Sequence, residues 1–184
     1  HASNVTGAIQ PVAAIGQVAK EAGVPFLVDG AQALGAMPVD VNALACQLYA
    51  FPGHKGLLGP QGTGGLYIDA ELDLQPLREG GTGSSSESML QPTERPERYE
   101  SGTLNLPGLA GLGAGARYVR ENLAQIFMRE REVTTALYDG LREIAGVEVY
   151  APAEEAARVG LVSFNAGDLT SSEAADYLAR EGVA

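Results

Sequence analysis

Three short apolar runs in the first half of the chain constrain its fold more than any other feature. They are VPFLVD at 24–29, QLYAF at 47–51 and TGGLYI at 63–68. Each run is too short for a helix and is typical of a buried strand, while the apolar stripe from Pro11 to Lys20, closed by Gly23, predicts a helix. Strands that follow helices or turns and end in polar groups indicate an α/β fold with a mainly parallel sheet. The ligand of such a sheet binds at the carboxyl ends of the strands.

The second half of the chain predicts a different organisation. Residues 79–106 are rich in Gly, Ser, Pro and charge without a sustained period, which predicts a long loop. We expect one helix from Pro107 to Asn122 and a second from Leu123 to Ile144. The later blocks predict two strands and a capped helix: VEVYAP at 147–152, GLVSFNAG at 160–167, and TSSEAADYLAREG at 170–182 with Thr170 or Ser171 and Glu173 as the cap. We therefore divide the chain into a large-domain part, 1–122, and part of a small α+β domain, 123–184.

Charge and cysteine content exclude several classes of function. Asp and Glu number 23 against 12 Lys and Arg, a formal charge of −11, which argues against a nucleic-acid surface. The single cysteine, Cys46, cannot form an internal disulfide, and no Cys/His cluster has the spacing of a zinc site. No apolar run is long enough to span a membrane and the start HASNVTG does not resemble a signal peptide, so we expect a cytoplasmic location.

Lys55 is the main candidate for chemistry. It is one of only two lysines and lies in GHKGLLGPQGTGG, where glycines and leucines surround it, whereas Lys20 lies among charged positions of a predicted helix. An amine in a desolvated loop is a good nucleophile for a carbonyl group, because its charged form is disfavoured. The alternative is a chance lysine in a glycine turn. A Walker phosphate loop is excluded because Gly56, and not Ser or Thr, follows the lysine.

Three further polar residues come close to Lys55 in the predicted sheet. Asp29 ends the neighbouring strand, so its carboxylate can enter the same crevice and keep a pyridine nitrogen protonated. A helix N-cap is the equally weighted alternative. If the ligand has a pyridine ring with a phenolic oxygen, Gln32 can donate to that oxygen; the alternative is a polar residue of a surface turn. His54 can donate to a phosphate. GLGAGA at 111–116 imitates a dinucleotide motif but lacks the preceding strand, so helix packing through small residues explains it better.

Four ordered motifs resemble one known family. They are HASNVTG, FLVDGAQALGAMPVDV, PGHKGLLGPQGTGGLYI and RYESGTLNLPGLAGL. In order and spacing they resemble the class V aminotransferases, which depend on pyridoxal 5′-phosphate (PLP), and most closely the cysteine desulfurases and selenocysteine-lyase-like members. The resemblance implies a PLP-dependent transferase of fold type I, with the large-domain part followed by the small domain.

The resemblance also implies a role for each matching residue. Lys55 would hold PLP as a Schiff base and then move the Cα proton of the substrate. Asp29 would pair with the pyridine nitrogen and Gln32 with the phenolic oxygen. His54 would bind the phosphate, and Asn4 would lie near the phenolic oxygen and the substrate carboxylate.

Other implied features concern a second subunit and residues outside this chain. Thr103, in ESGTLN, would reach the phosphate of the neighbouring subunit from a crossing loop at 79–106, so a homodimer is expected, and Thr82 is a weaker candidate from the same loop. Pro52 stands where the family usually carries Ser or Thr, which would weaken phosphate binding. We expect the first half of the large domain to lie before His1. The carboxylate-binding arginine and the nucleophilic cysteine would lie after Ala184.

The implied activity is that of a cysteine desulfurase. Such an enzyme converts L-cysteine to L-alanine and leaves the sulfur as an enzyme-bound persulfide, which passes to a sulfur-acceptor protein. Cys46 is not that nucleophile, because its position predicts a small buried thiol. This chain alone is expected to be inactive. The alternatives are a class V aminotransferase or epimerase, and a non-catalytic assembly subunit.

Overall fold

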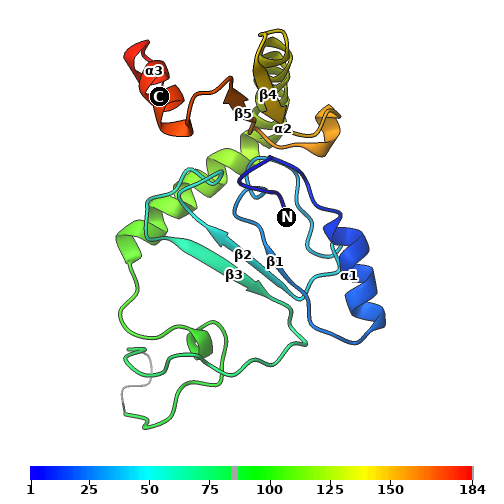
Figure 1. Cartoon of the computed structure of the whole chain (residues 1–184). Helices are drawn as coiled ribbons and strands as arrows, with labels where there is room; N and C mark the ends of the chain where they lie inside the picture. The colour runs from blue at the N-terminus through cyan, green and yellow to red at the C-terminus, as the bar shows by residue number, and fades with distance from the viewer. Residues whose placement is uncertain (84–86, 184) are drawn as a thin grey trace.

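A computed structural model describes residues 1–83 and 87–183 of the chain. Figure 1 shows a sheet flanked by a helix on one side and crossed at one end by a long helix that leads to the C-terminal elements. The first elements are helix α1 (Val12–Glu21) and strands β1 (Leu27–Asp29), β2 (Leu48–Pro52) and β3 (Gly64–Ile68). The predicted helix and all three predicted strands are therefore confirmed.

The described part of the sheet is mixed. Strands β1 and β2 are parallel, with Val28 beside Tyr49, whereas β2 and β3 are antiparallel, with Tyr49 beside Tyr67. The antiparallel pair has a simple cause, because the segment between β2 and β3 is too short for the crossover helix that a parallel pair needs. The parallel pair brings the ends of β1 and β2 to the same edge, as the sequence predicts.

The core of the sheet region lies between α1 and the strands. It consists of Val12, Val28, Leu44, Cys46 and Tyr49. Cys46 is 4% exposed, which confirms the predicted buried thiol, and burial raises the pKa of that thiol. Helix α1 lies close to the core because Gly16 contacts the backbone before Cys46: a Cβ on Gly16 would lie 2.1 Å from the Leu44 carbonyl oxygen.

Helix α2 (Leu106–Arg142) is one continuous helix of 37 residues. The expectation of two helices meeting at 122–123 is wrong, because no proline or glycine interrupts the sequence there, and the Asn122 side chain donates to the Tyr118 carbonyl oxygen at 2.8 Å. The predicted start is confirmed, with Asn105 as N-cap accepting from Gly108 N at 3.1 Å and Pro107 in the first turn. The proposed boundary between 122 and 123 lies within α2 and stays a prediction.

One face of α2 is lined by glycines that contact the segment between β2 and β3. A Cβ on Gly115 would lie 2.3 Å from the Leu57 carbonyl oxygen, and one on Gly111 would lie 2.8 Å from Pro60. Close helix packing through small residues therefore explains GLGAGA at 111–116, as predicted.

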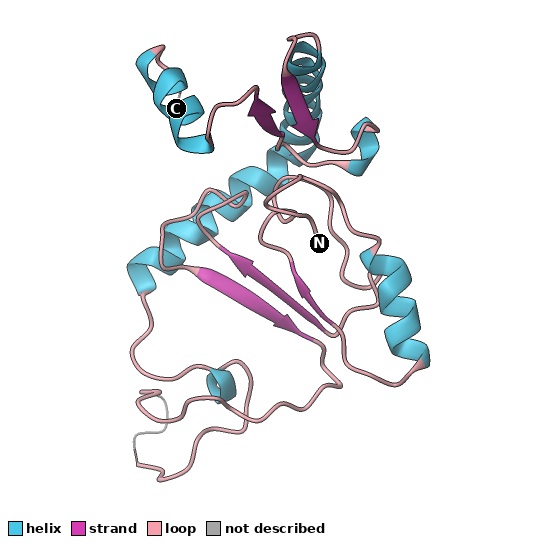
Figure 2. Ribbon diagram, in the orientation of Figure 1, coloured by secondary structure: helices cyan, strands magenta, loops and turns pink. Residues whose placement is uncertain are grey.

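The C-terminal elements are β4 (Val147–Tyr150), the short 3₁₀ helix η2 (Glu155–Ala157), β5 (Ser163–Ala166) and α3 (Ser171–Arg180). Strands β4 and β5 form a two-stranded antiparallel sheet, and the cap of α3 by Thr170 and Glu173 is confirmed as a capping box. Figure 2 shows that the described part of the segment from β3 to α2 is mostly loop, with one short 3₁₀ helix, η1 (Glu97–Tyr99). Among the described residues, no helix has both the length and the apolar character that a membrane crossing requires.

Candidate active site

The loop that carries Lys55, residues 53–63, is closed by backbone hydrogen bonds; we call it the lysine loop. Gly53 N donates to the Thr63 carbonyl oxygen and Gly59 N to the Gly53 carbonyl oxygen, both at 2.7 Å. Leu58 N donates to the Lys55 carbonyl oxygen at 2.9 Å, and Leu58 itself has a positive φ of 56°. The loop thus forms a tight double turn that presents Lys55 at the end of β2.

Asp29 and Lys55 line one cavity. Its volume is about 550 Å³, and it opens beside the ends of β1 and β2. His54 lies on the same cavity, so a carboxylate, an imidazole and an amine share one space. The remaining lining residues are Ala31, Ala50, Phe51, Pro52, Thr63, Gly64 and Gly65. Both candidates for a ring-binding pair therefore border the same open space at the ends of the strands.

The Asp29 carboxylate has two uses in this arrangement. One oxygen, Oδ1, accepts a hydrogen bond from Ala31 N at 2.8 Å and so stabilises the turn that follows β1. That turn does not lead into an α-helix. Asp29 therefore caps a turn and is not the N-cap of a helix. The second carboxylate oxygen has no partner among the described residues, which leaves it available to a ligand in the cavity.

A buried tyrosine supports the turn after Asp29. Tyr49 is 1% exposed, and a Cβ on Gly30 would lie 1.9 Å from its ring, so only glycine fits beside Asp29. Burial raises the pKa of the Tyr49 phenol, which keeps it protonated, and its oxygen lies 3.0 Å from His1 Nδ1. His1 is accordingly a neighbour of this support, and its amine also donates to the Asp29 carbonyl oxygen at 2.6 Å.

Gln32 reaches Lys55 through a second cavity of about 160 Å³. Gly56, Glu130 and Gly160 also line this space. Two glycines bring the turn after Gln32 against the lysine loop, because a Cβ on Gly35 would lie 2.3 Å from the Gly56 carbonyl oxygen. Lys55 therefore lies between two cavities, one with Asp29 and His54 and the other with Gln32.

The structure does not bring the other predicted residues to these cavities. Asn4 is exposed in a turn where Ser3 Oγ accepts from Val5 N and Thr6 N, both at 3.1 Å. Thr103 is exposed in the loop before α2. Thr82 lines a separate cavity of about 440 Å³ within the loop that it belongs to.

The expectation of a desolvated Lys55 is wrong for this chain as described. Lys55 and His54 are both exposed. The physical reason lies in their neighbours, since Gly53, Gly56 and Gly64 carry no side chains that could cover the amine, and the cavity is open on one side. Burial within this chain is therefore not what would activate Lys55.

Sequence reasoning missed several residues of the two cavities. Thr63, directly before β3, adds a hydroxyl to the cavity wall near Pro52. Because Gly64 at the start of β3 pairs with Pro52 at the end of β2, the predicted strand TGGLYI could have placed Thr63 there. Glu130 and Gly160 line the second cavity. Glu130 stands in the charged run MREREV, which gives no signal of a role near Lys55.

The structure thus combines a mixed α/β sheet with a lysine, an acid and a histidine that line one open space at the ends of β1 and β2. Residues 1–184 match the aminotransferase class-V family over their whole length, and the chain belongs to that family. Its architecture is that of the fold type I PLP-dependent enzymes.

The relatives carry the names of desulfurases. Probable cysteine desulfurases of Methanothermobacter thermautotrophicus and Pyrococcus abyssi are 38% and 40% identical over 183 residues, covering 97% of this chain and 45% of each relative. The apo structure of cysteine desulfurase from Thermococcus onnurineus is 39% identical with a TM-score of 0.90, and the match covers all of this chain and 47% of that one. A mutant C-DES protein with glycine covalently linked to its PLP cofactor is 29% identical with a TM-score of 0.86, and the match covers 100% of this chain and 50% of that one. The chain spans about half the length of the relatives that it matches.

Proposed function

We propose that this chain is part of a PLP-dependent cysteine desulfurase, which converts L-cysteine to L-alanine and leaves the sulfur as an enzyme-bound persulfide. The observation that carries the proposal is the cavity of about 550 Å³ on which Lys55, Asp29 and His54 meet. The names of the relatives at 38–40% identity support the choice of reaction.

The residues on the cavity fit the cofactor. PLP, when bound, supplies a carbonyl carbon for an amine and a ring that withdraws electrons from the substrate Cα. Lys55 offers the amine, the unoccupied oxygen of Asp29 accepts the proton of the ring nitrogen, and the His54 imidazole donates to a phosphate.

Lys55 would act first as the anchor and then as the group that moves a proton. Lys55 lines both cavities, and its side chain is flexible. The amine can therefore leave the cavity with Asp29 and stay close by, in the cavity with Gln32. After a substrate amine replaces Lys55 on the cofactor, the free Lys55 amine would take the proton from the substrate Cα and deliver it to a different atom. Gln32, across the second cavity, would donate to the phenolic oxygen. Asn4 would approach from its exposed turn and bind that oxygen and the substrate carboxylate.

Phosphate binding would differ from that of the family pattern. Pro52 offers neither a hydroxyl nor a backbone N–H. Thr63 lines the same cavity, and its hydroxyl donates to the Pro60 carbonyl oxygen at 2.6 Å. The hydroxyl must turn away from Pro60 to donate to a phosphate, so we expect lower phosphate affinity than a serine at position 52 would give.

A second subunit and an acceptor protein belong to the same proposal. Thr103 is exposed and lines neither cavity of its own chain, and the loop before it exposes Leu77, Met89 and Leu90 almost completely. A homodimer in which this loop packs on the second copy would cover these side chains and bring Thr103 to the partner's phosphate. A sulfur-acceptor protein and a cytoplasmic location complete the proposal.

The thiol that takes the sulfur in this proposal is not Cys46. Cys46 is 4% exposed in the core of the sheet, and its Sγ lies 3.8 Å from the Val41 carbonyl oxygen. An aminotransferase or epimerase would use the same cofactor contacts. A non-catalytic assembly subunit is the remaining candidate, favoured by the exposure of Leu27 and Leu66 on the strands of the sheet.

Reductive trapping of PLP tests the proposal directly. The chain has two lysines, so Lys55→Ala and Lys20→Ala form a matched pair. After PLP and borohydride, mass spectrometry of peptides should find the adduct on Lys55 in the unchanged chain and in Lys20→Ala, and none in Lys55→Ala. An adduct that persists in Lys55→Ala, or that forms on Lys20 alone, would contradict the proposal.

The reaction itself is tested with L-cysteine in the whole protein that contains these residues. Alanine and persulfide in equal amounts support a desulfurase. A keto acid would indicate an aminotransferase instead, and loss of stereochemistry at Cα would indicate an epimerase. No turnover with bound PLP would favour the assembly subunit.

A further inference from the structure

Tyr49 is a buried phenol beside the residues of the proposed site, and none of the proposed steps uses it. Only 1% of the residue is exposed, and it belongs to the core between α1 and the strands. Its ring lies against Gly30, the residue that follows Asp29, and a Cβ on Gly30 would lie 2.5 Å from the Tyr49 hydroxyl oxygen. The phenol therefore packs directly against the backbone that carries Asp29.

His1 joins this phenol to Asp29. Its imidazole Nδ1 lies 3.0 Å from the Tyr49 hydroxyl oxygen, with the two rings edge to face. Its backbone nitrogen donates to the Asp29 carbonyl oxygen at 2.6 Å. Burial raises the pKa of Tyr49, so the phenol keeps its proton and can donate it to Nδ1. In the part of the chain that the structure describes, the Tyr49 hydroxyl has no other hydrogen-bond partner, so it depends on His1.

The peptide between Asp29 and Gly30 is consequently held from three sides. His1 donates to its carbonyl oxygen, and the Tyr49 ring packs against Gly30. The peptide N–H, on Gly30, donates to the Ala50 carbonyl oxygen at 2.8 Å. A backbone held in this way leaves the Asp29 carboxylate few orientations, which favours one fixed position at the cavity.

His1 is anchored in turn by the C-terminal elements. Gln10 N donates to the His1 carbonyl oxygen, and Ile9 N donates to the carbonyl oxygen of Ala157 in η2, both at 2.9 Å. The segment that begins with His1 is therefore fixed on η2.

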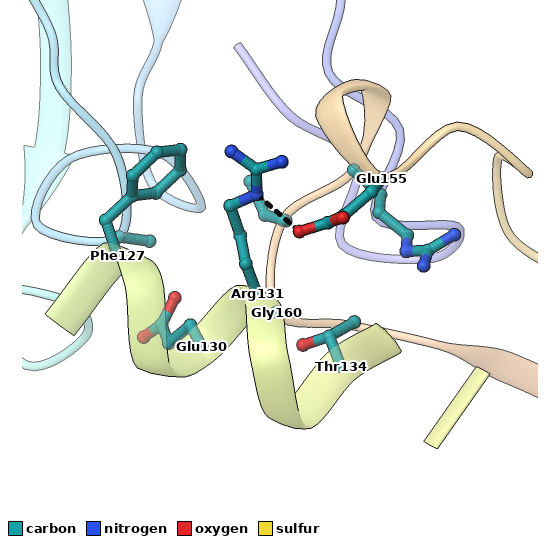
Figure 3. Close-up of a pocket in the computed structure, with 9 residues that line it drawn as sticks. Phe127, Glu130, Arg131, Thr134, Glu155 and Gly160 are labelled. Atoms are coloured by element: carbon teal, nitrogen blue, oxygen red, sulfur yellow. Dashed lines mark hydrogen bonds and ion pairs between the residues drawn. The ribbon is translucent and has the colours of Figure 1, made fainter. Parts of the chain in front are cut away.

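Helix α2 keeps η2 in place. Figure 3 shows Arg131 of α2 and Glu155 of η2 joined by a dashed line, and Arg131 Nε donates to Glu155 Oε1 at 2.8 Å. The guanidinium of Arg158, directly after η2, lies 4.1 Å from the centre of the Tyr138 ring on the same helix. Movements of His1 are thus limited by contacts that are distant from it in the sequence.

We propose that His1 and Tyr49 clamp the peptide between Asp29 and Gly30 and so hold the Asp29 carboxylate against the ring nitrogen of bound PLP. The Tyr49 hydroxyl donates to His1 Nδ1, and the His1 backbone nitrogen donates to the Asp29 carbonyl oxygen. Tyr49 is too buried to contact a ligand, so it is a positioning residue that acts through the peptide. The contact with the ring rests on the proposed function, whereas the clamp itself does not.

Amide exchange tests the clamp without any cofactor. The Ala31 N–H donates to Asp29 Oδ1, so its exchange reports how firmly the carboxylate is held. Tyr49→Phe keeps the ring and removes the hydroxyl, while His1→Ala removes the imidazole and keeps the backbone nitrogen. At one fixed pH, each change should speed the exchange of the Ala31 N–H by about tenfold.

Tyr67→Phe is the matched control. Tyr67 lies beside Tyr49 in the sheet, and its hydroxyl donates to Asp69 Oδ2 at 3.4 Å. Loss of this hydroxyl should leave the exchange of the Ala31 N–H unchanged. Unchanged exchange in both Tyr49→Phe and His1→Ala would overturn the clamp. An equal rise in the amides of β3 would also overturn it, because that pattern indicates a general loss of stability.

The contact with the ring is tested in the whole protein that contains these residues, with PLP that carries an NMR-active isotope at its ring nitrogen. The resonance of this nitrogen distinguishes a protonated ring from a neutral one. Tyr49→Phe should move the resonance toward that of the neutral ring, which a loss of stability alone would not cause, and should weaken PLP binding by about fivefold. Tyr67→Phe should leave both unchanged.

An unchanged resonance in both Tyr49→Phe and His1→Ala would overturn the positioning role. If the whole protein bound no PLP, the proposed function would fail, and the exchange of the Ala31 N–H would still decide whether the clamp exists.

Discussion

Two loops of this chain are rich in glycine, and they use it in opposite ways. In the lysine loop, a Cβ on Gly56 would lie 2.4 Å from the Leu34 carbonyl oxygen, and one on Gly53 would lie 2.2 Å from Thr63 Oγ1 across the loop and 2.9 Å from Leu112 of α2. In the loop between β3 and α2, Gly80, Gly83 and Gly102 have positive φ angles, and a Cβ on any of them would meet nothing within 4 Å. Glycine therefore mainly allows close packing in the first loop and mainly backbone turning in the second, with one exception in each: Gly62 meets nothing within 4 Å, and a Cβ on Gly81 would lie 3.1 Å from Gly102 Cα.

The two loops are also held by different forces. The lysine loop is fixed by packing on three sides, against β3, the turn after Gln32 and the glycine face of α2. The long loop depends on polar contacts of a few side chains, such as the 3.0 Å ion pair between Arg98 and Asp73. A packed loop holds chemical groups at fixed positions, whereas a loop with few contacts in its own chain is suited to contact a second one.

The largest expected effect comes from filling the packed contact between α2 and the lysine loop. Gly115→Ala would place a methyl group 2.3 Å from the Leu57 carbonyl oxygen, and we expect it to lower the free energy of unfolding by about 3 kcal/mol. PLP trapping on Lys55 should fall with it. Urea unfolding followed by circular dichroism measures the first effect.

Gly140→Ala is the matched control, because it lies on the same helix with nothing within 4 Å of its Cβ position. This change should raise the free energy of unfolding by about 0.5–1 kcal/mol, since alanine favours a helix over glycine. Equal effects at both positions would show that packing on the lysine loop does not distinguish them.

A smaller effect is expected in the long loop. The Gln91 side chain accepts from Gly80 N at 2.8 Å and donates to the carbonyl oxygens of Glu97, Arg98 and Glu100 at 2.9–3.3 Å. Gln91→Ala should release the loop, with about 1 kcal/mol or less lost from global stability. Limited proteolysis between β3 and α2 should become faster.

Gln91→Glu sharpens this test, because it keeps the acceptor for Gly80 N and removes the donors. If the donors hold the loop, this variant should be cleaved about as fast as Gln91→Ala. Cleavage at the rate of the unchanged chain would mean that contacts other than Gln91 hold the loop.

Features set by neighbouring residues could be predicted from the sequence, whereas features set by distant contacts could not. The strands and the placement of Asp29, His54 and Lys55 at one edge follow from apolar runs that end in polar groups, a local signal. The single helix α2 was predicted as two, although no proline or glycine around Asn122 marks a break. Glu130 was missed because Lys55 and Gln32, with which it lines the second cavity, are distant from it in the sequence.

The smallest expected effect lies in α3, whose first turn is capped by the charged Glu173 carboxylate. The stability of this helix should therefore depend on pH, whereas that of the packed lysine loop should not. The Thr170 hydroxyl and backbone N–H donate to the Glu173 carboxylate at 2.7 and 2.9 Å, and these bonds lower the pKa of Glu173. A lowered pKa means that the ionised form is favoured by folding, so its contribution is present above the ordinary glutamate pKa of 4.5 and is lost as the pH falls through the folded value. The protection of the α3 amides, taken as their exchange rate relative to the intrinsic rate at the same pH, should therefore fall at acid pH, and Thr170→Ala should remove most of that dependence, while Ser172→Ala keeps it. An equal pH dependence in both variants would place the cause elsewhere in the helix.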